Sequence, residues 1–380
     1  LGIAESPSEG ISKGVINSIE DAVSSISSCL EKAERMTGMP IEHSYVAISG
    51  SHIVSQDSHG IVAVSKADGE IKDDDVERAI EAAQTVATPP NYEILHVIPR
   101  SFTVDNQKGI KDPIGMTGIR LEVDAEIILG QSSQIKNLTK CIYRTSVDID
   151  DLVLGVLASA ESILTKRQKD LGVAVLNIGG STTSLLVMEE GDVIHTAILP
   201  IGSGHITNDI AIGLRTSIDV AEKIKVEYGS SQPKEINKRD EIDLSEVSSQ
   251  ESERVSHKHV AEIIEARLEE IFDMVEKELK KIGRSGLLPA GIVLTGGGAR
   301  LPGIVETAKS MFKLPCHVGY PLEVVTAIDK INDPTFTTAI GLVLWGSELS
   351  VKPSQIFKGG RSSVKEVTGK MNKWFKSLMP

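Results

Sequence analysis

Two glycine-bearing stretches of this chain carry residues that could hold a phosphate group. The first spans residues 176–184 and reads Leu-Asn-Ile-Gly-Gly-Ser-Thr-Thr-Ser. Its candidate binding residues are Gly179, Gly180, Ser181, Thr182 and Thr183. Glycine lets the backbone approach a ligand closely, successive N–H groups in a turn attract anions, and hydroxyl groups add hydrogen-bond donors. A Gly-Gly turn between two strands is also a common hairpin, so both interpretations remain open.

The second stretch, residues 294–303, follows an apolar run with Gly296, Gly297 and Gly298. A strand that passes through glycines into a helix brings helical N–H groups toward a phosphate or a nucleoside. A flexible strand-to-helix loop explains the same pattern. Between the two stretches, Glu222 and Lys225 are three residues apart and therefore share one helix face. They could hydrogen-bond a ribose and a base, or they could form a solvated ion pair.

The spacing of apolar residues predicts an α/β chain in two halves. Helices are expected over 18–37, 73–87, 134–144, 158–169, 206–214, 217–228, 257–282, 304–312 and 335–345. Strands are expected at 45–49, 61–65, 92–98, 119–129, 151–157, 172–178, 182–188, 193–199 and 291–295. Ser18 and Gly38 are the residue types that begin and end a helix, so they should bound the first one. The polar segment 229–256 is expected to be rich in loops.

The composition limits the function classes. The chain of 380 residues has a formal net charge of −13 and no basic stripe, which argues against a nucleic-acid partner. The sequence contains no apolar run of about 18 residues that could span a bilayer, and we expect no signal peptide. The three cysteines are far apart, as in a protein with reduced thiols. His257 and His259 could bind a metal, but further ligands are not evident and solvated side chains are the simpler interpretation.

The last twenty residues form a basic amphipathic segment. At helical spacing its apolar residues fall on one stripe, which consists of Val364, Val367, Met371, Trp374, Phe375, Leu378 and Met379. Five basic residues, Lys370 and Lys373 among them, and a single acidic residue lie largely elsewhere. A cationic helix with Trp and Phe on an acidic protein is typical of an interfacial membrane anchor. A last helix packed on its own domain is the alternative.

The order of these features resembles a known superfold. A glycine hairpin, a Glu-x-x-Lys helix and a strand–Gly-Gly-Gly–helix turn follow one another in the actin/Hsp70/sugar-kinase superfold. Four further stretches resemble FtsA, a family of actin-like bacterial cell-division proteins. They are Ile48-Ser49-Gly50-Ser51-His52-Ile53, Ile94-Leu95-His96-Val97-Ile98-Pro99, Gly109-Ile110-Lys111-Asp112-Pro113-Ile114-Gly115-Met116, and Leu152 to Ser162. The stretches are long, stand in the family's order and run along nearly the whole chain.

The resemblance implies an actin/Hsp70-like (ribonuclease H-like) α/β fold of two domains, with a small α+β inserted subdomain and a C-terminal amphipathic helix. The expected parts are a first half at 1–50 and 127–170, an inserted SHS2-like subdomain at 51–126, a second half at 171–228 and 284–346, its outer subdomain at 229–283, a linker at 347–361 and the amphipathic helix at 362–380. The family opens with another phosphate-binding hairpin. Because the chain begins at Leu1, we expect that this piece is missing.

The resemblance also implies ATP and Mg²⁺ as cofactors. Gly179 to Thr183 would hold the phosphates, Glu222 and Lys225 would lie at the ribose and base, and Gly296 to Gly298 would run along the adenosine. The implied function is an actin-like division protein that self-assembles and recruits the tubulin-like protein FtsZ. It would act with other division proteins on the anionic inner face of the cytoplasmic membrane, at the division site.

Two positions depart from the family's phosphate hairpin, which normally begins with Asp and often ends with Asp. This chain has Asn177 and Ser184 there. A carboxylate would help to order Mg²⁺ and the attacking water, whereas an amide supplies no negative charge. We therefore expect ATP hydrolysis to be slow or absent, and no catalytic residue is assigned.

Two other functions remain open at this point. One is that of a pilus-assembly actin-like protein, whose relatives share this type of insert, and the other is an ATPase or small-molecule kinase of the same superfold. The tail and residues 110–113 favour division over pilus assembly. A soluble kinase has no use for a cationic amphipathic end, and the insert has no evident acid–base cluster.

Overall fold

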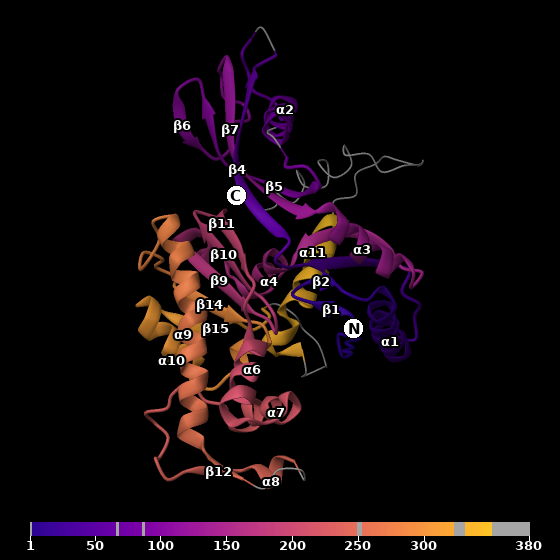
Figure 1. The fold of residues 1–380 in the computed structure, drawn as a ribbon. Coiled ribbons are helices and arrows are strands. Elements are labelled where there is room, and N and C mark those ends of the chain that lie inside the picture. Colours follow the sequence, from indigo (N-terminus) through magenta and orange to yellow (C-terminus); the bar gives the residue numbers. More distant parts are fainter. Residues whose placement is uncertain (1, 66–67, 86–87, 249–252, 323–330, 352–380) are drawn as a thin grey trace.

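The computed structural model describes residues 2–65, 68–85, 88–248, 253–322 and 331–351. The expected amphipathic helix at 362–380 and most of the expected linker lie outside the described residues. In Figure 1 the strands of the insert lie at one end of the molecule and the loop-rich segment lies at the other, with the two halves between them. None of the described helices combines the length and apolar character needed to cross a membrane.

The second half is built on a five-stranded sheet. Its strands are β9 (Val173–Ile178), β10 (Thr183–Glu189), β11 (Asp192–Leu199), β14 (Ile292–Thr295) and β15 (Cys316–Val318), in the order β11-β10-β9-β14-β15. β9, β10 and β11 form an antiparallel meander, while β14 runs parallel to both β9 and β15. The carboxyl ends of β9 and β14 therefore lie at the same edge of the sheet.

Both faces of this sheet are covered, because its strands are apolar on both sides. Leu176 and Leu185 pack on the long helix α9 (His257–Lys281) and on α10 (Ile304–Phe312). Val175 and Leu186, one position along, pack on the other face against α4 (Gly155–Ile163). Figure 1 shows α9 and α10 together on one side of the strands. The covered sheet forms a rigid base for the loops at its edge.

The outer part of the second half carries short elements. Helices α6 (Ser203–Leu214) and α7 (Ile218–Tyr228) follow the meander. The segment expected to be loop-rich holds three small elements, which are β12 (Glu241–Asp243), α8 (Leu244–Val247) and β13 (Arg254–Ser256). Ile242, Leu244 and Val247 anchor these elements on the core that also contains α6, α7 and α9.

The first half begins with a short hairpin of β1 (Ile11–Ser12) and β2 (Val15–Ile16). Helix α1 (Ile19–Thr37) follows and is bounded as expected, since Ser18 caps its first turn and Gly38 ends it in a left-handed conformation. Strands β3 (His43–Ile48) and β8 (Asp148–Leu154) pair in parallel, with α3 (Ser132–Tyr143) alongside.

Two helices connect the halves at the centre of the molecule. They are α4 and α11 (Thr337–Val351). The short helix η3 (Pro334–Phe336) comes directly before α11. The backbones of α4 and α11 touch, because a Cβ added to Gly341 would lie only 1.7 Å from the carbonyl oxygen of Ala158. Glycine is therefore required where α4 and α11 cross.

The insert between β3 and β8 is a four-stranded antiparallel sheet with one helix. Its elements are β4 (Ile53–Ala63), α2 (Asp73–Gln84), β5 (Tyr92–Val104), β6 (Gln107–Ile110) and β7 (Arg120–Gln131), and the strand order is β4-β7-β5-β6. Apolar and polar residues alternate along β7 as expected, so Leu121, Val123 and Ile127 point to one face and form a core with α2. On the opposite face of β7, Glu122, Asp124 and Glu126 are polar, whereas Ile128 joins the core of the first half.

Several expectations about local structure were wrong, beginning with the short strand expected at 61–65, which is the end of the much longer β4. The strand expected at 151–157 ends at Leu154, and α4 starts at once, because an unbroken apolar run fits a buried strand and a buried helix equally well. The helix expected over 158–169 is interrupted, since Thr165 caps a separate helix, α5 (Lys166–Leu171). Helix α11 continues to Val351, so the first residues of the segment expected to be a linker are helical.

Candidate functional site

The two glycine stretches lie side by side at one edge of the sheet. Strand β9 ends beside β14 with Asn177 opposite Thr295, and each strand then enters its glycine turn. Gly296 has φ of 83°, and a Cβ there would lie 2.4 Å from Asn177 Oδ1 and 2.6 Å from the carbonyl oxygen of Ile178. Gly298 is equally confined by the Ile178 side chain, at 2.4 Å. The turns are therefore held against each other by backbone contact.

The first glycine turn is also fixed to helix α6. The Gly179 N–H donates across the turn to the carbonyl of Thr182 at 2.8 Å. The backbone N–H of Ser203 donates to the Gly179 carbonyl at 2.8 Å, and that of Gly204 donates to the Gly180 carbonyl at 2.7 Å. This approach also requires glycine just before α6, because a Cβ on Gly202 would lie 2.5 Å from the Gly179 oxygen. The turn is thus preorganised without a ligand.

The five residues expected to hold phosphates are placed differently. Gly180 is exposed, and a Cβ there would touch nothing within 4 Å. Ser181 and Thr182 are partly exposed beside it. Thr183 is fully buried, and its hydroxyl donates to the Ile201 carbonyl at 2.8 Å. The backbone of the turn and the first two hydroxyl groups are therefore accessible to an anion, whereas the Thr183 hydroxyl already has a partner within the protein.

Asn177 lies in an uncharged polar network below the two turns. Its Nδ2 donates to Ser159 Oγ at 2.9 Å and to Thr338 Oγ1 at 3.2 Å, and these two hydroxyl oxygens lie 2.8 Å apart. Ser184, at the other departure from the family pattern, lies 3.3 Å from Ser49 Oγ. The network joins α4 of the first half, β9 of the second and α11 between them. The side chains at these positions supply hydroxyl and amide groups rather than carboxylates.

Glu222 and Lys225 form an ion pair on α7. Their charged atoms lie 2.6 Å apart, and Lys225 also donates to Thr207 Oγ1 at 2.8 Å. Burial alone would raise the pKa of Glu222, but hydrogen bonds from Lys225 and Thr207 outweigh it and lower that pKa. Lys225 also lies 3.4 Å from the Ser203 carbonyl, in the turn of α6 that holds the phosphate-type loop. Lys225 therefore contacts the start of α6, which in turn holds the first glycine turn.

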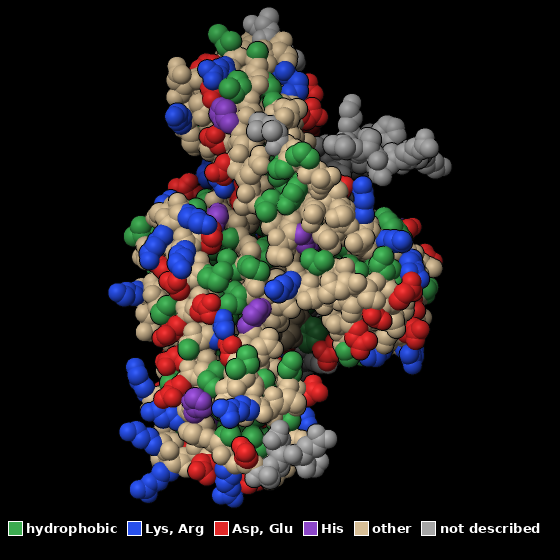
Figure 2. All heavy atoms as spheres, viewed as in Figure 1, with side chains coloured by type: hydrophobic (Ala, Val, Ile, Leu, Met, Phe, Trp, Pro, Cys, Tyr) green, Lys and Arg blue, Asp and Glu red, His purple; other side chains and the backbone are tan. Residues whose placement is uncertain are grey.

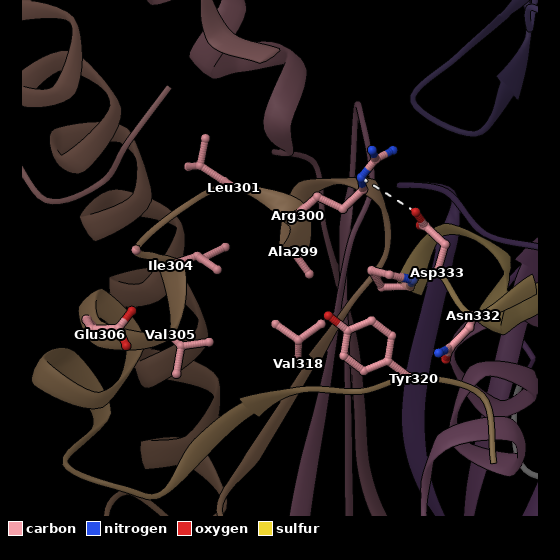
Figure 3. A pocket seen from close by; sticks show the side chains of 12 residues that line it. Ala299, Arg300, Leu301, Ile304, Val305, Glu306, Val318, Tyr320, Asn332 and Asp333 are labelled. Atoms are coloured by element: carbon pink, nitrogen blue, oxygen red, sulfur yellow. Dashed lines mark ion pairs between the residues drawn. The ribbon is translucent and has the colours of Figure 1, made fainter. Parts of the chain in front are cut away.

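A pocket of about 440 Å³ adjoins the second glycine turn. Figure 3 shows Ala299, Ile304, Val305 and Val318 around its interior, with the Tyr320 ring beside them. At one side Arg300 and Asp333 approach to 3.6 Å as an ion pair. The pocket is thus lined by apolar side chains and by polar or charged ones, Glu306 and Asn332 among them. Figure 2 shows the surface hollowed between the side that carries α1 and the arm that carries α6 and α7.

The described residues give no support to a metal site formed by the protein alone. No group of three His, Cys, Asp or Glu side chains converges among them. His257 Nε2 donates a hydrogen bond to the Tyr228 carbonyl, 2.8 Å away, while His259 lies 3.9 Å from Glu262 on the surface. A Mg²⁺ ion bound with a nucleotide would take its ligands largely from water and from the phosphate oxygens.

Comparison of the sequence with known proteins decides the family. The family model "Cell division protein FtsA" matches residues 174–341, and "SHS2 domain inserted in FTSA" matches residues 50–129. The chain is 39% identical over 346 residues to the cell division protein FtsA of Pseudomonas aeruginosa, which is 91% of this chain and 82% of that relative. The chain belongs to the FtsA family of cell division proteins. The FtsA of Escherichia coli is 32% identical over 385 residues, covering 100% of this chain and 90% of the relative.

A solved structure supports the same fold. The PilM-PilN type IV pilus biogenesis complex superposes with a TM-score of 0.65 over 91% of this chain and 90% of that one, at 17% identity. At this identity the likeness concerns the fold alone. Together with the SHS2 match it confirms the expected actin-like α/β fold with an inserted subdomain.

The sequence analysis missed residues that support the FtsA-type site. Gly202 and Gly204 fit against the first glycine turn, and the sequence Gly-Ser-Gly directly before a helix was a usable signal for a close backbone approach. Ser159 and Thr338 surround Asn177 but are single polar residues on apolar helices, far from it in sequence. No local pattern marks such residues.

Proposed function

We propose that this FtsA-family chain binds ATP between its halves, assembles into actin-like filaments and attaches FtsZ to the inner face of the cytoplasmic membrane. The observation that carries the nucleotide part is the pair of glycine turns at the carboxyl ends of β9 and β14. Ligands of open α/β sheets bind at such edges, where N–H groups are exposed. The turn at Gly180 would take the phosphates, and Gly296 to Gly298 would run along the adenosine.

Gly180 offers a sharp test of nucleotide binding. A side chain at this position meets no other atom within 4 Å, so Gly180→Asp should fold normally while placing a carboxylate at the proposed phosphate position. Titration with a fluorescent ATP analogue should show at least a roughly tenfold weaker Kd for Gly180→Asp, because like charges repel. Gly180→Ala is the matched control and should bind almost as well as the unaltered chain. Equal affinities for all three proteins would refute this phosphate site.

The uncharged network around Asn177 supports the proposal that hydrolysis is slow or absent. An amide in this position adds no negative charge to order Mg²⁺ and water. When bound, Mg²⁺ would neutralise phosphate charge, and Asn177 would only orient polar groups near it. Phosphate release by the full chain should stay at background. Measurable turnover that falls in Asn177→Ala would contradict this assignment.

Membrane attachment is proposed from residues 362–380, whose structure is outside the described residues. The residues proposed to enter the membrane are Val364, Val367, Lys370, Met371, Lys373, Trp374, Phe375 and Leu378. Each basic residue near an anionic leaflet contributes roughly 1 kcal/mol, and burial of Trp, Phe and Leu adds a few more. One such helix binds weakly, but a filament that presents many of them binds tightly through effective concentration.

Co-sedimentation with anionic liposomes tests this attachment. The full chain should sediment with the liposomes, the chain without residues 361–380 should not, and Trp374→Glu should bind much less because it places a charge on the apolar stripe. Equal binding by the full and shortened chains would end the proposal. Adding FtsZ to the same liposomes tests the tether directly, since FtsZ should then sediment only when the full chain is present.

A further inference from the structure

A buried carboxylate joins the inserted subdomain to the second half. Glu126 on β7 is only 1% exposed. Its Oε1 accepts hydrogen bonds from the backbone N–H of Thr196, at 3.1 Å, and from the Thr196 hydroxyl, at 2.9 Å. Thr196 belongs to β11, the edge strand of the five-stranded sheet. A buried charge is costly unless it is paired, so this contact must be stabilised by partners on both sides.

Arg100 on β5 supplies the opposite charge. Its guanidinium lies 3.3 Å from Glu126 Oε2 and 2.8 Å from Asp57. Glu126 Oε2 nevertheless completes no hydrogen bond, and neither does Arg100 Nε. Oε1 of Glu126 thus accepts two hydrogen bonds from Thr196 of the second half, whereas Oε2 takes part only in the ion pair with Arg100. The hydrogen bonds of Glu126 Oε1 fix how the insert lies on β11. Because Glu126 Oε2 and Arg100 Nε lack hydrogen-bond partners, separating the two parts costs less free energy than separating a fully hydrogen-bonded contact.

Two further residues of the insert, Ser55 and Lys111, contact the second half beside the Glu126–Thr196 contact. Ser55 on β4 donates to the Thr196 carbonyl at 3.0 Å. Lys111, after β6, forms ion pairs with Asp192 and with Glu190, the latter at 3.4 Å. All of these partners lie on β11 or in the turn before it. Figure 1 shows the strands of the insert directly beside the β10–β11 end of the sheet.

Strand β11 connects this junction with the first glycine turn. β10 pairs with β11 along its whole length, from Glu189 opposite Asp192 to Thr183 opposite Leu199. Beyond Leu199, the Ile201 carbonyl accepts from Thr183, and α6 holds the glycine turn. The same two-stranded ribbon therefore has the first glycine turn at one end, while the insert contacts it near its middle, at Thr196, and at its other end, at Asp192.

We propose that the Glu126–Thr196 contact couples the inserted subdomain to the nucleotide turn, so that nucleotide binding and the docking of the insert on β11 change each other. This inference rests on the proposed nucleotide binding. Reciprocal coupling between two sites is required by thermodynamics, and effects of roughly 5-fold to 150-fold in affinity are typical. The β10–β11 ribbon would transmit the coupling. Hydrogen exchange of the Thr196 backbone amide measures whether the insert is docked.

The test uses the full chain and two conservative variants. Glu126→Gln keeps the shape and removes the charge that Arg100 pairs with, and Thr196→Val keeps the volume and removes the hydroxyl donor. Asp124→Asn is the matched control, because Asp124 is two residues away on the same strand but contacts His59 within the insert, at 2.8 Å. Circular dichroism confirms that all four proteins fold.

Two measurements are made on each protein, namely the Kd for a fluorescent ATP analogue and hydrogen exchange of residues 192–199 with and without ATP. In the unaltered chain, ATP should change exchange at Thr196, and both junction variants should shift the Kd by about 5-fold or more, with Asp124→Asn unchanged. ATP binding without a change in exchange, and with the same Kd in all four proteins, would overturn the coupling alone. No ATP binding by the unaltered chain would overturn the proposed nucleotide function itself, and the coupling with it.

Discussion

The two glycine turns and the junction of the insert are held together by opposite means. At the turns, glycines meet backbone oxygens, and the nearby polar groups are the uncharged side chains of Asn177, Ser159 and Thr338. At the junction, Glu126 and Lys111 contact the second half through their charged groups, and Arg100 pairs with Glu126 from within the insert. The first region depends on shape and the second on charge. The uncharged groups at the turns suit the phosphates that we propose they bind, whereas the junction that we propose for coupling uses charge.

The largest effect should follow from adding one carbon atom at the turns. Gly296→Ala places a methyl group 2.4 Å from Asn177 Oδ1 and forces a φ of 83° on alanine. We expect a loss of more than about 3 kcal/mol in the free energy of unfolding, measured by urea denaturation. Gly297→Ala is the control in the same turn, because its nearest neighbour, Thr335 Cγ2, would be 3.6 Å away. Similar losses in the two variants would show that shape does not dominate this region.

The next effect concerns His96, where the insert meets the first half. Its Nε2 accepts the Leu154 N–H at 3.0 Å, its ring contacts Trp345, and burial lowers its pKa to about 4. A lowered pKa means that the unfolded chain takes up the proton first. The free energy of unfolding should therefore fall as the pH drops from about 6.5 toward 4, by up to roughly 3 kcal/mol. His96→Gln keeps an acceptor and should flatten this part of the pH profile; an unchanged slope would contradict the assignment.

A smaller loss is expected at the uncharged network. Asn177→Ala removes two hydrogen bonds and should lower the free energy of unfolding by about 1–2 kcal/mol in thermal or urea denaturation. Ser181→Ala, in the neighbouring turn, should leave stability unchanged but weaken binding of the fluorescent ATP analogue. If Ser181→Ala lowered the free energy of unfolding as much as Asn177→Ala, the distinction between the structural network around Asn177 and the accessible glycine turn would fail.

The smallest effect should come from the exposed part of the junction. Lys111 is 42% exposed on its side chain and pairs with Asp192 and Glu190. Lys111→Ala should cost less than about 1 kcal/mol, and the difference from the unaltered chain should shrink further in high salt. A loss that persists in 1 M salt would mean that Lys111 acts through packing instead of charge.

Local sequence patterns predicted many of the helices and strands, because these elements depend mainly on residues that are neighbours in the sequence. The caps at Ser18 and Gly38, the meander of β9 to β11 and the long helix α9 all follow from spacing and residue type. The short strands β6 and β15 were missed, since three or four residues give no periodicity and their pairing partners lie elsewhere in the chain.

The candidate site was predicted where it consists of glycine turns and was missed where it consists of side-chain contacts. Asn177 and Thr338 are 161 residues apart, and Glu126 and Thr196 are 70 apart. Such pairs are set by how sheets and helices pack, which no local spacing encodes. The resemblance supplied the fold, but it could not supply contacts that depend on this chain's own side chains.

The crossing of α4 and α11 has a mechanical consequence. Helices with large side chains interlock through ridges and grooves, which fixes the angle between them. Gly341 and Ala158 instead meet through bare backbone. We expect the two halves to turn relative to each other around this close contact at Gly341. Opening of the interdomain space would then be governed by the contacts farther out, at the glycine turns and at the insert.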